Sequence, residues 1–497
     1  MNKSDERNEK VKNWLKQPLN LALLGVFAFA FFIRMFYFNL TKLQPLWWDE
    51  AAYGMLAKNF ISHAWDASDI VIGELTIRPP FFPLIWSYLL RIGLDEIGVR
   101  FILEFVPSVL AVLFVYLIGK ELYDQKIGII SAAIFAPLWI HLFYSSRLLT
   151  DVPALVFILA GMFFFLKSTK NKFVPKLFVV SLILTSIGTL FRYPHGLIFF
   201  VYAAFILLTG KIVLLKDKKF WITGIAGLVP MWIFFLVNYV KTGNIFPALL
   251  GGGYAEAVSQ SFAFNILSFI PLYLKAIFFI FFLVGLAVSL FEIFLGYDQL
   301  KTHERIKSHL FNILSIVIIY SYFIFKIRGA EDRWLMILGF SFVRLSALGI
   351  DYAYGFVKKY NKNIAVIGLI VVVLFGMYSQ VIFGKDVIDQ RRESFSQMRE
   401  GFEWIEANTP PDAVILGQGI EVYSLYYSGR MYEKLKPIGN TSEFEPVKAQ
   451  YLVLHAFVPQ DQLQGYLNNN YDKWEAINAF FFDKEQKQAA LIIYKAK

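Results

Sequence analysis

The chain has no cysteine and carries little charge. None of its 497 residues is cysteine, and 17% are Asp, Glu, Lys or Arg. Without cysteine the protein forms no disulfide and offers no thiolate as a metal ligand or nucleophile. The absence leaves the cellular compartment open, because a chain without cysteine is compatible with either side of a membrane.

Apolar residues stand where charge is missing: 57% of residues are hydrophobic, 52 are phenylalanine, and the mean hydropathy is +0.53. Runs of about 18 apolar residues or more are long enough to span a hydrocarbon core. Such runs recur along most of the chain, which predicts a mainly α, polytopic transmembrane bundle of about eleven helices. Their expected ranges are 19–40, 98–119, 127–146, 152–167, 177–191, 196–215, 220–240, 267–296, 310–327, 334–355 and 364–383.

The distribution of basic residues predicts the orientation. The net charge of +10 lies in short clusters between apolar runs, so we attribute it to membrane topology and expect no nucleic-acid partner. With the N-terminal tail in the cytoplasm, the lysine-rich loops fall on the inside, and the opposite loops hold mostly single basic residues. An odd number of spans then places the C-terminal segment outside. We therefore expect a multi-pass protein of the cell membrane, with a cytoplasmic N-terminus and an extracytoplasmic C-terminal domain.

Two domains are predicted. Residues 1–384 form the transmembrane domain, with a large first extracytoplasmic loop at 41–97, and residues 385–497 form a small α/β domain. In the loop, PPFFPLIWSYLLRIG is typical of an interfacial helix with Trp86 and Tyr88 at headgroup depth. In the second domain, SFSQMREGFEWIEANTPP indicates an amphipathic helix followed by a strand, and YLVLHAF and AALIIYKA indicate further strands.

A carboxylate pair stands at the start of the first loop, in LQPLWWDEAAYGMLAKNF. Asp49 and Glu50 follow two tryptophans directly after the first apolar run. They open an expected short helix on which Glu50, Tyr53 and Gly54 share a face. Two adjacent acids need surroundings that keep them charged, so we expect them to be functional.

Further charged residues gather at the outer ends of the expected spans. Ionisable groups at membrane depth are costly unless they are paired or face water, so they indicate a functional site. They are Arg78 in TIRPPFF, Arg147 and Asp151 in SSRLLTDVP, Arg192 and His195 in FRYPHG, and Arg328, Glu331, Asp332 and Arg333 in RGAEDRW.

The same residues also have structural interpretations. Arg147, Arg192 and Arg333 would then only extend from helix ends toward water. Asp151 would cap a helix together with the preceding threonine, and His195 would be a core histidine. Against these, carboxylates and arginines on one face suit a general base and a phosphate-binding group. This combination suggests transfer of a group from a phosphate-anchored lipid.

Parts of the chain resemble a known enzyme superfamily. DEAAY, IRPPFFPLIWSYLLRIG and the stretch from GVRFILEF to GMFFF resemble the glycosyltransferase-C superfamily. The likeness is strongest to the family 39-like branch that holds protein O-mannosyltransferases and lipid A aminoarabinose transferases. It extends over about residues 15–210 and is thinner at NYVKTGNIFP and EDRWLMILGF.

This resemblance implies a fold and a reaction. Members transfer a sugar, with inversion, from a polyprenyl-phosphate donor such as dolichyl phosphate mannose to an acceptor hydroxyl on the extracytoplasmic side. The acceptor is a protein, a lipid or a glycan. The implied roles are catalytic for Asp49, Glu50 and Asp151, with Asp49 as base; binding of the donor phosphate for Arg78, Arg147 and Arg333; and lining of the site for Tyr53, Arg192, His195 and Arg328.

One departure from the family pattern concerns metal binding. Relatives often have Glu-Lys-Pro-Pro where this chain has Ile77, Arg78 and two prolines. The change from Lys to Arg keeps the charge, but the missing acid weakens any metal site that depends on it. We therefore predict no metal or other cofactor; a divalent ion is possible but not supported by the sequence.

Two alternative functions remain open. A single-subunit oligosaccharyltransferase carries its WWD signature in the outer domain, whereas WWD here lies in the first loop, at Trp47, Trp48 and Asp49. A lipid or glycan transporter or flippase would place polar residues near the bilayer midplane and show repeat symmetry. Apart from Arg34, we expect little charge at that depth, and the sequence has no evident repeat.

Overall fold

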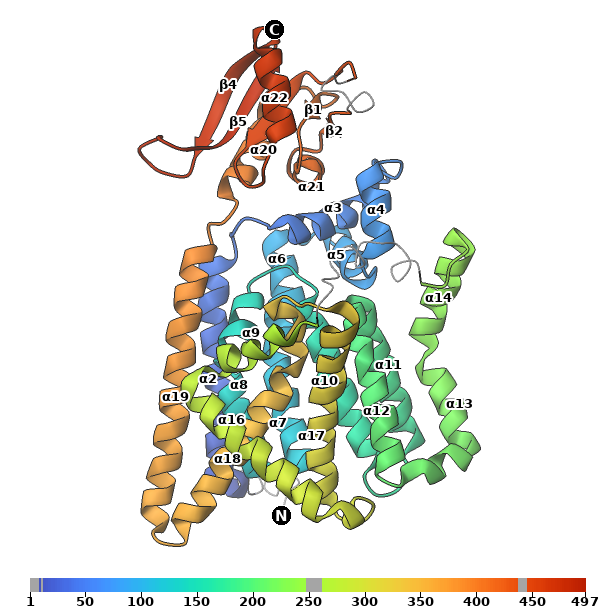
Figure 1. The fold of residues 1–497 in the computed structure, drawn as a ribbon, viewed down its shortest axis with the longest axis vertical. Coiled ribbons are helices and arrows are strands. Elements are labelled where there is room, and N and C mark those ends of the chain that lie inside the picture. The colour runs from blue at the N-terminus through green and yellow to red at the C-terminus, as the bar shows by residue number, and fades with distance from the viewer. Residues whose placement is uncertain (1–8, 10–11, 247–261, 437–444) are drawn as a thin grey trace. The chain divides into compact units, whose positions relative to one another are not determined.

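The computed structural model describes residue 9 and residues 12–246, 262–436 and 445–497 (Figure 1). The chain divides into two compact units. The first, here the helical unit, comprises residues up to 42, 77–81 and 96–388. The second, here the mixed unit, comprises 43–76, 82–95 and 389–497, so it joins most of the first loop to the C-terminal segment. The glycine-rich stretch LLGGGYAEAVSQS lies outside the described residues.

Within the described part of the chain, seven helical segments are long and apolar enough to cross a membrane, and the protein is a multi-pass membrane protein. They are α2 (Pro18–Thr41); α6 (Glu96–Arg100) with α7 (Val106–Leu122); α10 (Asp151–Thr169); η5 (Phe264–Ser268) with α16 (Phe269–Leu295); α17 (Glu304–Ser321) with η7 (Tyr322–Ile327); η8 (Asp332–Leu338) with α18 (Gly339–Lys358); and α19 (Lys362–Arg391), which continues outside the apolar stretch into α20 (Ser396–Asn408). A pair bent by 54° and three shorter apolar helices occupy the remaining expected spans. The pair is α13 (Lys218–Gly227) and α14 (Val229–Thr242), and the shorter helices are α8 (Gln125–Phe135), α11 (Pro175–Phe191) and η2 to α12 (Tyr193–Leu208). The predicted polytopic helical fold is confirmed.

The third expected span, 127–146, is not one helix. It breaks between α8 and α9 (Trp139–Tyr144), because Pro137 has no backbone N–H and cannot continue the helical ladder. Arg34 on α2 satisfies a backbone carbonyl at this break: its Nη1 donates to the carbonyl of Ala136 at 2.8 Å. Its Nε donates to the carbonyl of Ser108 at 3.1 Å. The one charge noted within a span is therefore bonded to backbone carbonyls.

A second arginine lies within an expected span, and the scarcity of charge at the bilayer midplane stays a prediction. Arg344 on α18 is fully buried, and its Nε donates to Asn312 Oδ1 at 2.8 Å. His309 on α17 is also fully buried. Both sit within long apolar segments, and each is held by polar neighbours that the periodicity of the sequence does not reveal.

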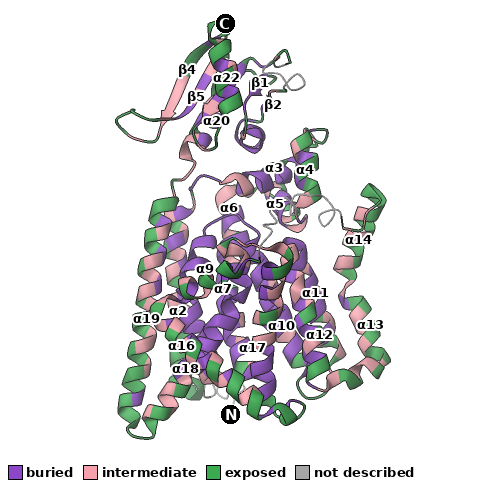
Figure 2. Cartoon of the chain, in the orientation of Figure 1, coloured by how far each residue is buried: buried purple, intermediate pink, exposed green. Residues whose placement is uncertain are grey.

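The interior of the helical unit depends on close helix contacts. Most residues of α10 and α18 are buried, whereas α13 and α14 bury little beyond Gly227 (Figure 2). Helices α16 and α18 approach until their backbones touch, because a Cβ added at Gly285 or Gly349 would overlap a carbonyl oxygen of the other helix. Small residues permit such packing between membrane helices.

The mixed unit is built on a five-stranded sheet in the order β2-β1-β3-β5-β4. Strand β1 (Val414–Leu416) runs parallel to β2 (Met431–Glu433) and β3 (Tyr451–His455), and β5 (Ala489–Ala496) runs antiparallel to β3 and β4 (Trp474–Phe481). Helix α20 (Ser396–Asn408) packs on β4 and β5. The predicted helix and three strands are confirmed, and β2 and β4 were not predicted.

The first-loop helices of this unit are α3 (Trp48–Ser62), α4 (Asp69–Ile77) and α5 (Phe81–Arg91). The predicted helix at PPFFPLIWSYLLRIG is confirmed as α5, and the position of Trp86 and Tyr88 at headgroup depth stays a prediction. Trp86 is fully buried, and its ring centroid lies 6.2 Å from that of Tyr426. Tyr88, on the same helix, is 64% exposed.

Candidate functional site

The expected site residues fall in both units. In the helical unit, α10 and α11 are consecutive neighbours that run side by side (Figure 1). A chain that turns back after α10 brings the end of α11 to the start of α10. This geometry joins Asp151, the first residue of α10, to Arg192, which ends α11: Nη1 lies 3.1 Å from Oδ1.

The ion pair bears on two structural interpretations: that Asp151 caps a helix, and that Arg192 only extends toward water. Thr150 is the N-cap of α10, but its side chain makes no capping hydrogen bond, and Asp151 is already within the helix. Asp151 is 1% exposed and Arg192 14%, so the arginine turns toward a buried carboxylate rather than toward water. Pro153 in the first turn of α10 suits a helix start, since its missing N–H has no partner there.

Arg147 lies in the turn before α10 and is fully buried, which contradicts a simple extension toward water. Its guanidinium lies 5.9 Å from the ring of Phe143. Arg100, on α6, reaches the same turn and donates from Nη1 to the carbonyl of Ser146 at 3.1 Å. Arg100 was not predicted as part of the site, although GVRF puts a charge at the outer end of the second span.

Asp151, Arg192 and Arg147 form a cluster of charged residues at the start of α10. The segment RGAEDRW adds to it, because its helix η8 (Asp332–Leu338) packs against α9 and α10. Tyr144 donates to Asp332 Oδ1 at 3.0 Å, and both Asp332 and Asp151 interact electrostatically with Tyr144. Tyr273 donates to the backbone carbonyl of Asp332. Arg333 pairs with Glu331 at 2.7 Å. The two tyrosines were missed because neither carries a charge that marks it in the sequence.

Three further expected residues lie in the helical unit. The carbonyl of Arg78 accepts a hydrogen bond from the hydroxyl of Tyr193 at 3.4 Å, so this residue lies next to the end of α11. His195 is buried in the short helix η2 (Tyr193–Gly196), and its backbone N–H donates to the backbone carbonyl of Arg192. Arg328 has a left-handed backbone with φ 59° and lies 5.7 Å from the ring of Phe262.

In the mixed unit, Asp49 and Glu50 occupy the first turn of α3, as predicted, but their environments differ. Glu50 is fully buried, and its Oε2 accepts the backbone N–H of Trp47 at 2.8 Å, the reciprocal bond of a capping box. Asp49 is partly exposed. Tyr53 packs on Phe82, with ring centroids 5.1 Å apart. Glu50 therefore fixes the helix start that presents Asp49.

Among the residues that the structure describes, no group of three or more His, Asp or Glu side chains could hold a metal ion. The expectation that the protein works without a resident metal stays a prediction.

Residues 77–237 match a protein-family model described as dolichyl-phosphate-mannose-protein mannosyltransferase. The structure of ArnT from Cupriavidus metallidurans bound to undecaprenyl phosphate superposes with a TM-score of 0.61 at 12% identity, covering 95% of this chain and 97% of that one. The chain has the glycosyltransferase-C fold.

Other solved structures share this fold at a similarly low sequence identity. The apo oligosaccharyltransferase of Archaeoglobus fulgidus superposes with a TM-score of 0.58 at 14% identity; the match covers 82% of this chain but 64% of that one. The arabinofuranosyltransferase AftD from mycobacteria gives a TM-score of 0.53 at 10% identity, covering 96% and 40%. No curated protein sequence matches the chain significantly.

Proposed function

We propose that the protein is a membrane glycosyltransferase that moves a sugar from a polyprenyl-phosphate donor to an acceptor hydroxyl on the extracytoplasmic side. The observation that carries the proposal is the cluster of arginines and carboxylates at the start of α10, on a fold shared with ArnT, whose structure contains undecaprenyl phosphate. The cluster joins the ends of helices that are far apart in sequence.

The arginines supply the donor side of the reaction. Arg147 is fully buried and brings a guanidinium into the turn that precedes α10. A guanidinium presents parallel N–H groups that match a phosphate. Arg192 and Arg333 are held by Asp151 and Glu331, so their forks are oriented before a phosphate arrives. This assigns Asp151 to positioning Arg192.

The acceptor side is assigned to Asp49. Its carboxylate removes the proton of the acceptor hydroxyl, and the oxygen attacks the anomeric carbon. The bond from that carbon to the phosphate oxygen breaks, and the lipid phosphate leaves with the electron pair, stabilised by arginine. One displacement inverts the anomeric centre. Glu50 is assigned a supporting role, because its carboxylate accepts the N–H of Trp47.

The test uses purified protein in lipid with radiolabelled polyprenyl-phosphate hexose or pentose, and an extract of its own cells as acceptor. We expect label to leave the prenyl donor with wild type and not with Asp49→Asn. The matched control is Asp412→Asn, which removes an exposed carboxylate of the same unit and should leave transfer unchanged. Full transfer by a folded Asp49→Asn protein would refute the assignment of the base.

An oligosaccharyltransferase activity is the second candidate, because the Archaeoglobus enzyme shares the fold. The same preparation, given a lipid-linked oligosaccharide and a peptide with an Asn-X-Thr sequence, decides between them. Transfer to asparagine would favour this alternative. Binding of prenyl lipid by folded protein without transfer from any donor would favour a transporter or flippase.

A further inference from the structure

A cavity of about 230 Å³ lies in the helical unit, at the end of α10 remote from Asp151. Its wall is formed by the turn between α7 and α8, the end of α10, the short helix η3 (Lys211–Lys216) and the start of α17. Nineteen residues of helix separate the two ends of α10, roughly 28 Å at 1.5 Å per residue. This is close to the thickness of a hydrocarbon core, so the cavity is at the opposite headgroup level and distinct from the site above.

Four cations line the cavity: Lys170, Lys211, Arg305 and Lys307. Lys211 differs from the others in its partners. Its ammonium donates to the carbonyls of Thr169 and, at 3.2 Å, of Lys170, which end α10, and these two oxygens are its partners among the described residues. Burial, and then the charge of Lys307, lower the pKa of Lys211 below its ordinary value of 10.5.

Each carboxylate in the wall already has a partner, and for two of them the partner is another cation of the wall. Glu121 pairs with Lys170 at 3.1 Å, and Glu304 pairs with Lys307 at 2.6 Å. Asp351 pairs with Lys126, and Asp124 accepts the N–H of Ile127 at 2.8 Å as the N-cap of α8. Among the described residues Lys211 forms no salt bridge; the charge of Glu304 acts on it, but that carboxylate is paired with Lys307.

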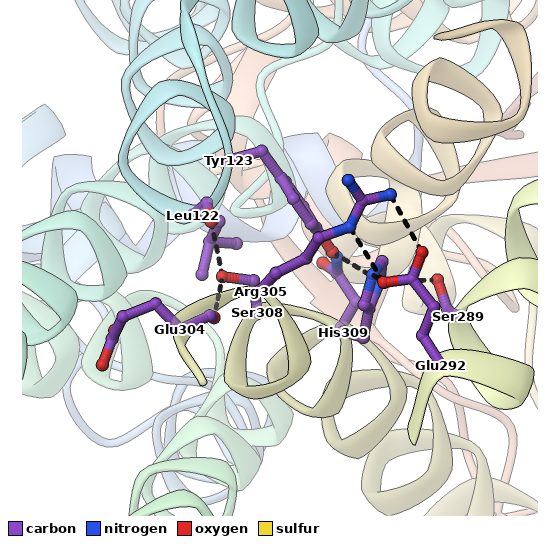
Figure 3. A network of polar contacts seen from close by, with 9 residues as sticks. Leu122, Tyr123, Ser289, Glu292, Glu304, Arg305, Ser308 and His309 are labelled. Carbon is purple, nitrogen blue, oxygen red and sulfur yellow. Dashed lines mark hydrogen bonds and ion pairs between the residues drawn. The ribbon is translucent and has the colours of Figure 1, made fainter. Parts of the chain in front are cut away.

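Arg305, at the same wall, is half exposed and makes a bidentate contact with one carboxylate (Figure 3). Its Nε and Nη2 bind both oxygens of Glu292, at 2.9 and 3.0 Å. Glu292 in turn lies 3.0 Å from Nε2 of His309, whose Nδ1 is 2.9 Å from the hydroxyl of Ser289. A histidine that donates to the carboxylate and accepts from the hydroxyl fixes both groups. The buried histidine therefore orients the guanidinium.

We propose that this cavity binds a phosphate group, either the headgroup of a lipid or free phosphate, with Lys211, Lys307 and Arg305 as its ligands. A phosphate supplies the salt bridge that Lys211 lacks among the described residues, and ammonium and guanidinium groups are the side chains that bind phosphate best. The depth of the cavity suits the headgroup of a lipid in the leaflet away from Asp151. The site is separate from the proposed transfer reaction and does not rest on it.

The test is a binding measurement that involves no sugar donor. Full-length protein in a non-ionic detergent is titrated calorimetrically with inorganic phosphate and with soluble dihexanoyl phosphatidic acid; dihexanoylglycerol is the uncharged control. We expect Lys211→Gln to weaken phosphate binding about ten-fold or more, as loss of a charged hydrogen bond does. Lys216→Gln, an exposed cation of the same short helix, should leave affinity within about two-fold.

Each outcome is informative. Tighter binding of phosphatidic acid than of inorganic phosphate assigns the site to a lipid, and equal binding assigns it to free phosphate. Failure of both probes to bind wild type, or equal loss in Lys211→Gln and Lys216→Gln, would overturn the proposal. If Lys211→Gln does not fold, Lys307→Gln must weaken binding and Lys211→Arg must retain it.

Discussion

The strength of the Asp151–Arg192 pair can be measured by a double-mutant cycle. Its atoms are 3.1 Å apart, and the two side chains are 1% and 14% exposed. Unit charges about 4 Å apart attract by about 4 kcal/mol at an effective dielectric constant of about 20. Loss of hydration offsets part of this attraction. We therefore expect a net coupling free energy of about 1–3 kcal/mol.

Asp151→Asn and Arg192→Gln should each lower the free energy of unfolding, because each removes this ion pair from a charge that is largely shielded from water. The double mutant should lose less than the sum of the two. Unfolding in mixed micelles, followed by tryptophan fluorescence, measures all four proteins. The control cycle uses Arg399 and Glu403, an exposed pair on α20 at 2.7 Å, with an expected coupling of about 0.3–0.5 kcal/mol. Additivity at Asp151 and Arg192 within about 0.5 kcal/mol would refute the reasoning.

Three other predictions concern packing, hydrogen bonding and pH. Gly285→Ala should destabilise the helical unit by about 1–3 kcal/mol, because the new methyl overlaps the carbonyl of Leu345. Arg34→Met should cost about 1–3 kcal/mol for each carbonyl that loses its donor, that of Ala136 among them. Burial lowers the pKa of His455 below 6.5, so the folded state holds it neutral and the unfolded chain binds the proton more readily. Its contribution to stability is therefore present above about pH 6.5 and lost as pH falls.

The measurements are unfolding transitions with matched variants. Gly368→Ala, where nothing lies within 4 Å of the added Cβ, should be neutral or slightly stabilising, because alanine favours a helix over glycine. A loss equal to that of Gly285→Ala would contradict the packing argument. Arg34→Lys should recover little, since Arg34 donates through all three nitrogens. His455→Gln should flatten the fall of the unfolding temperature between pH 7.5 and pH 5. An unchanged slope would exclude His455 as its source.

Sequence reasoning found those parts of the fold that depend on local pattern. Apolar runs indicate membrane helices because each run must satisfy its own backbone in lipid. Pro137, which breaks the helix, can be read from the sequence. The hydrogen bond that satisfies the Ala136 carbonyl at this break comes from Arg34, 102 positions away, and cannot be read from it. The burial of Trp86 was missed for the same reason, because its neighbour Tyr426 belongs to the far end of the chain.

The sequence indicated most of the charged residues of the candidate site, but missed two of its tyrosines. Charge at helix ends identified Asp151, Arg192 and Arg333, because an ionisable residue stands out against an apolar run. It could not identify Tyr144, whose hydroxyl orients Asp332, since tyrosine is common at membrane interfaces. Nor could it separate Asp49 from Glu50: the capping role of Glu50 follows from a backbone N–H, not from residue type.

The bonds of Arg34 have a consequence for synthesis and membrane insertion. Arg34 enters the bilayer on the first helix, where an arginine at the centre costs about 2.5–3.5 kcal/mol. Its acceptor at Ala136 follows 102 residues later, about 5–20 s at ordinary elongation rates. We expect the nascent first helix to stay beside the insertion machinery over that interval, and crosslinking of stalled chains would detect it. An Arg34→Leu chain should leave earlier.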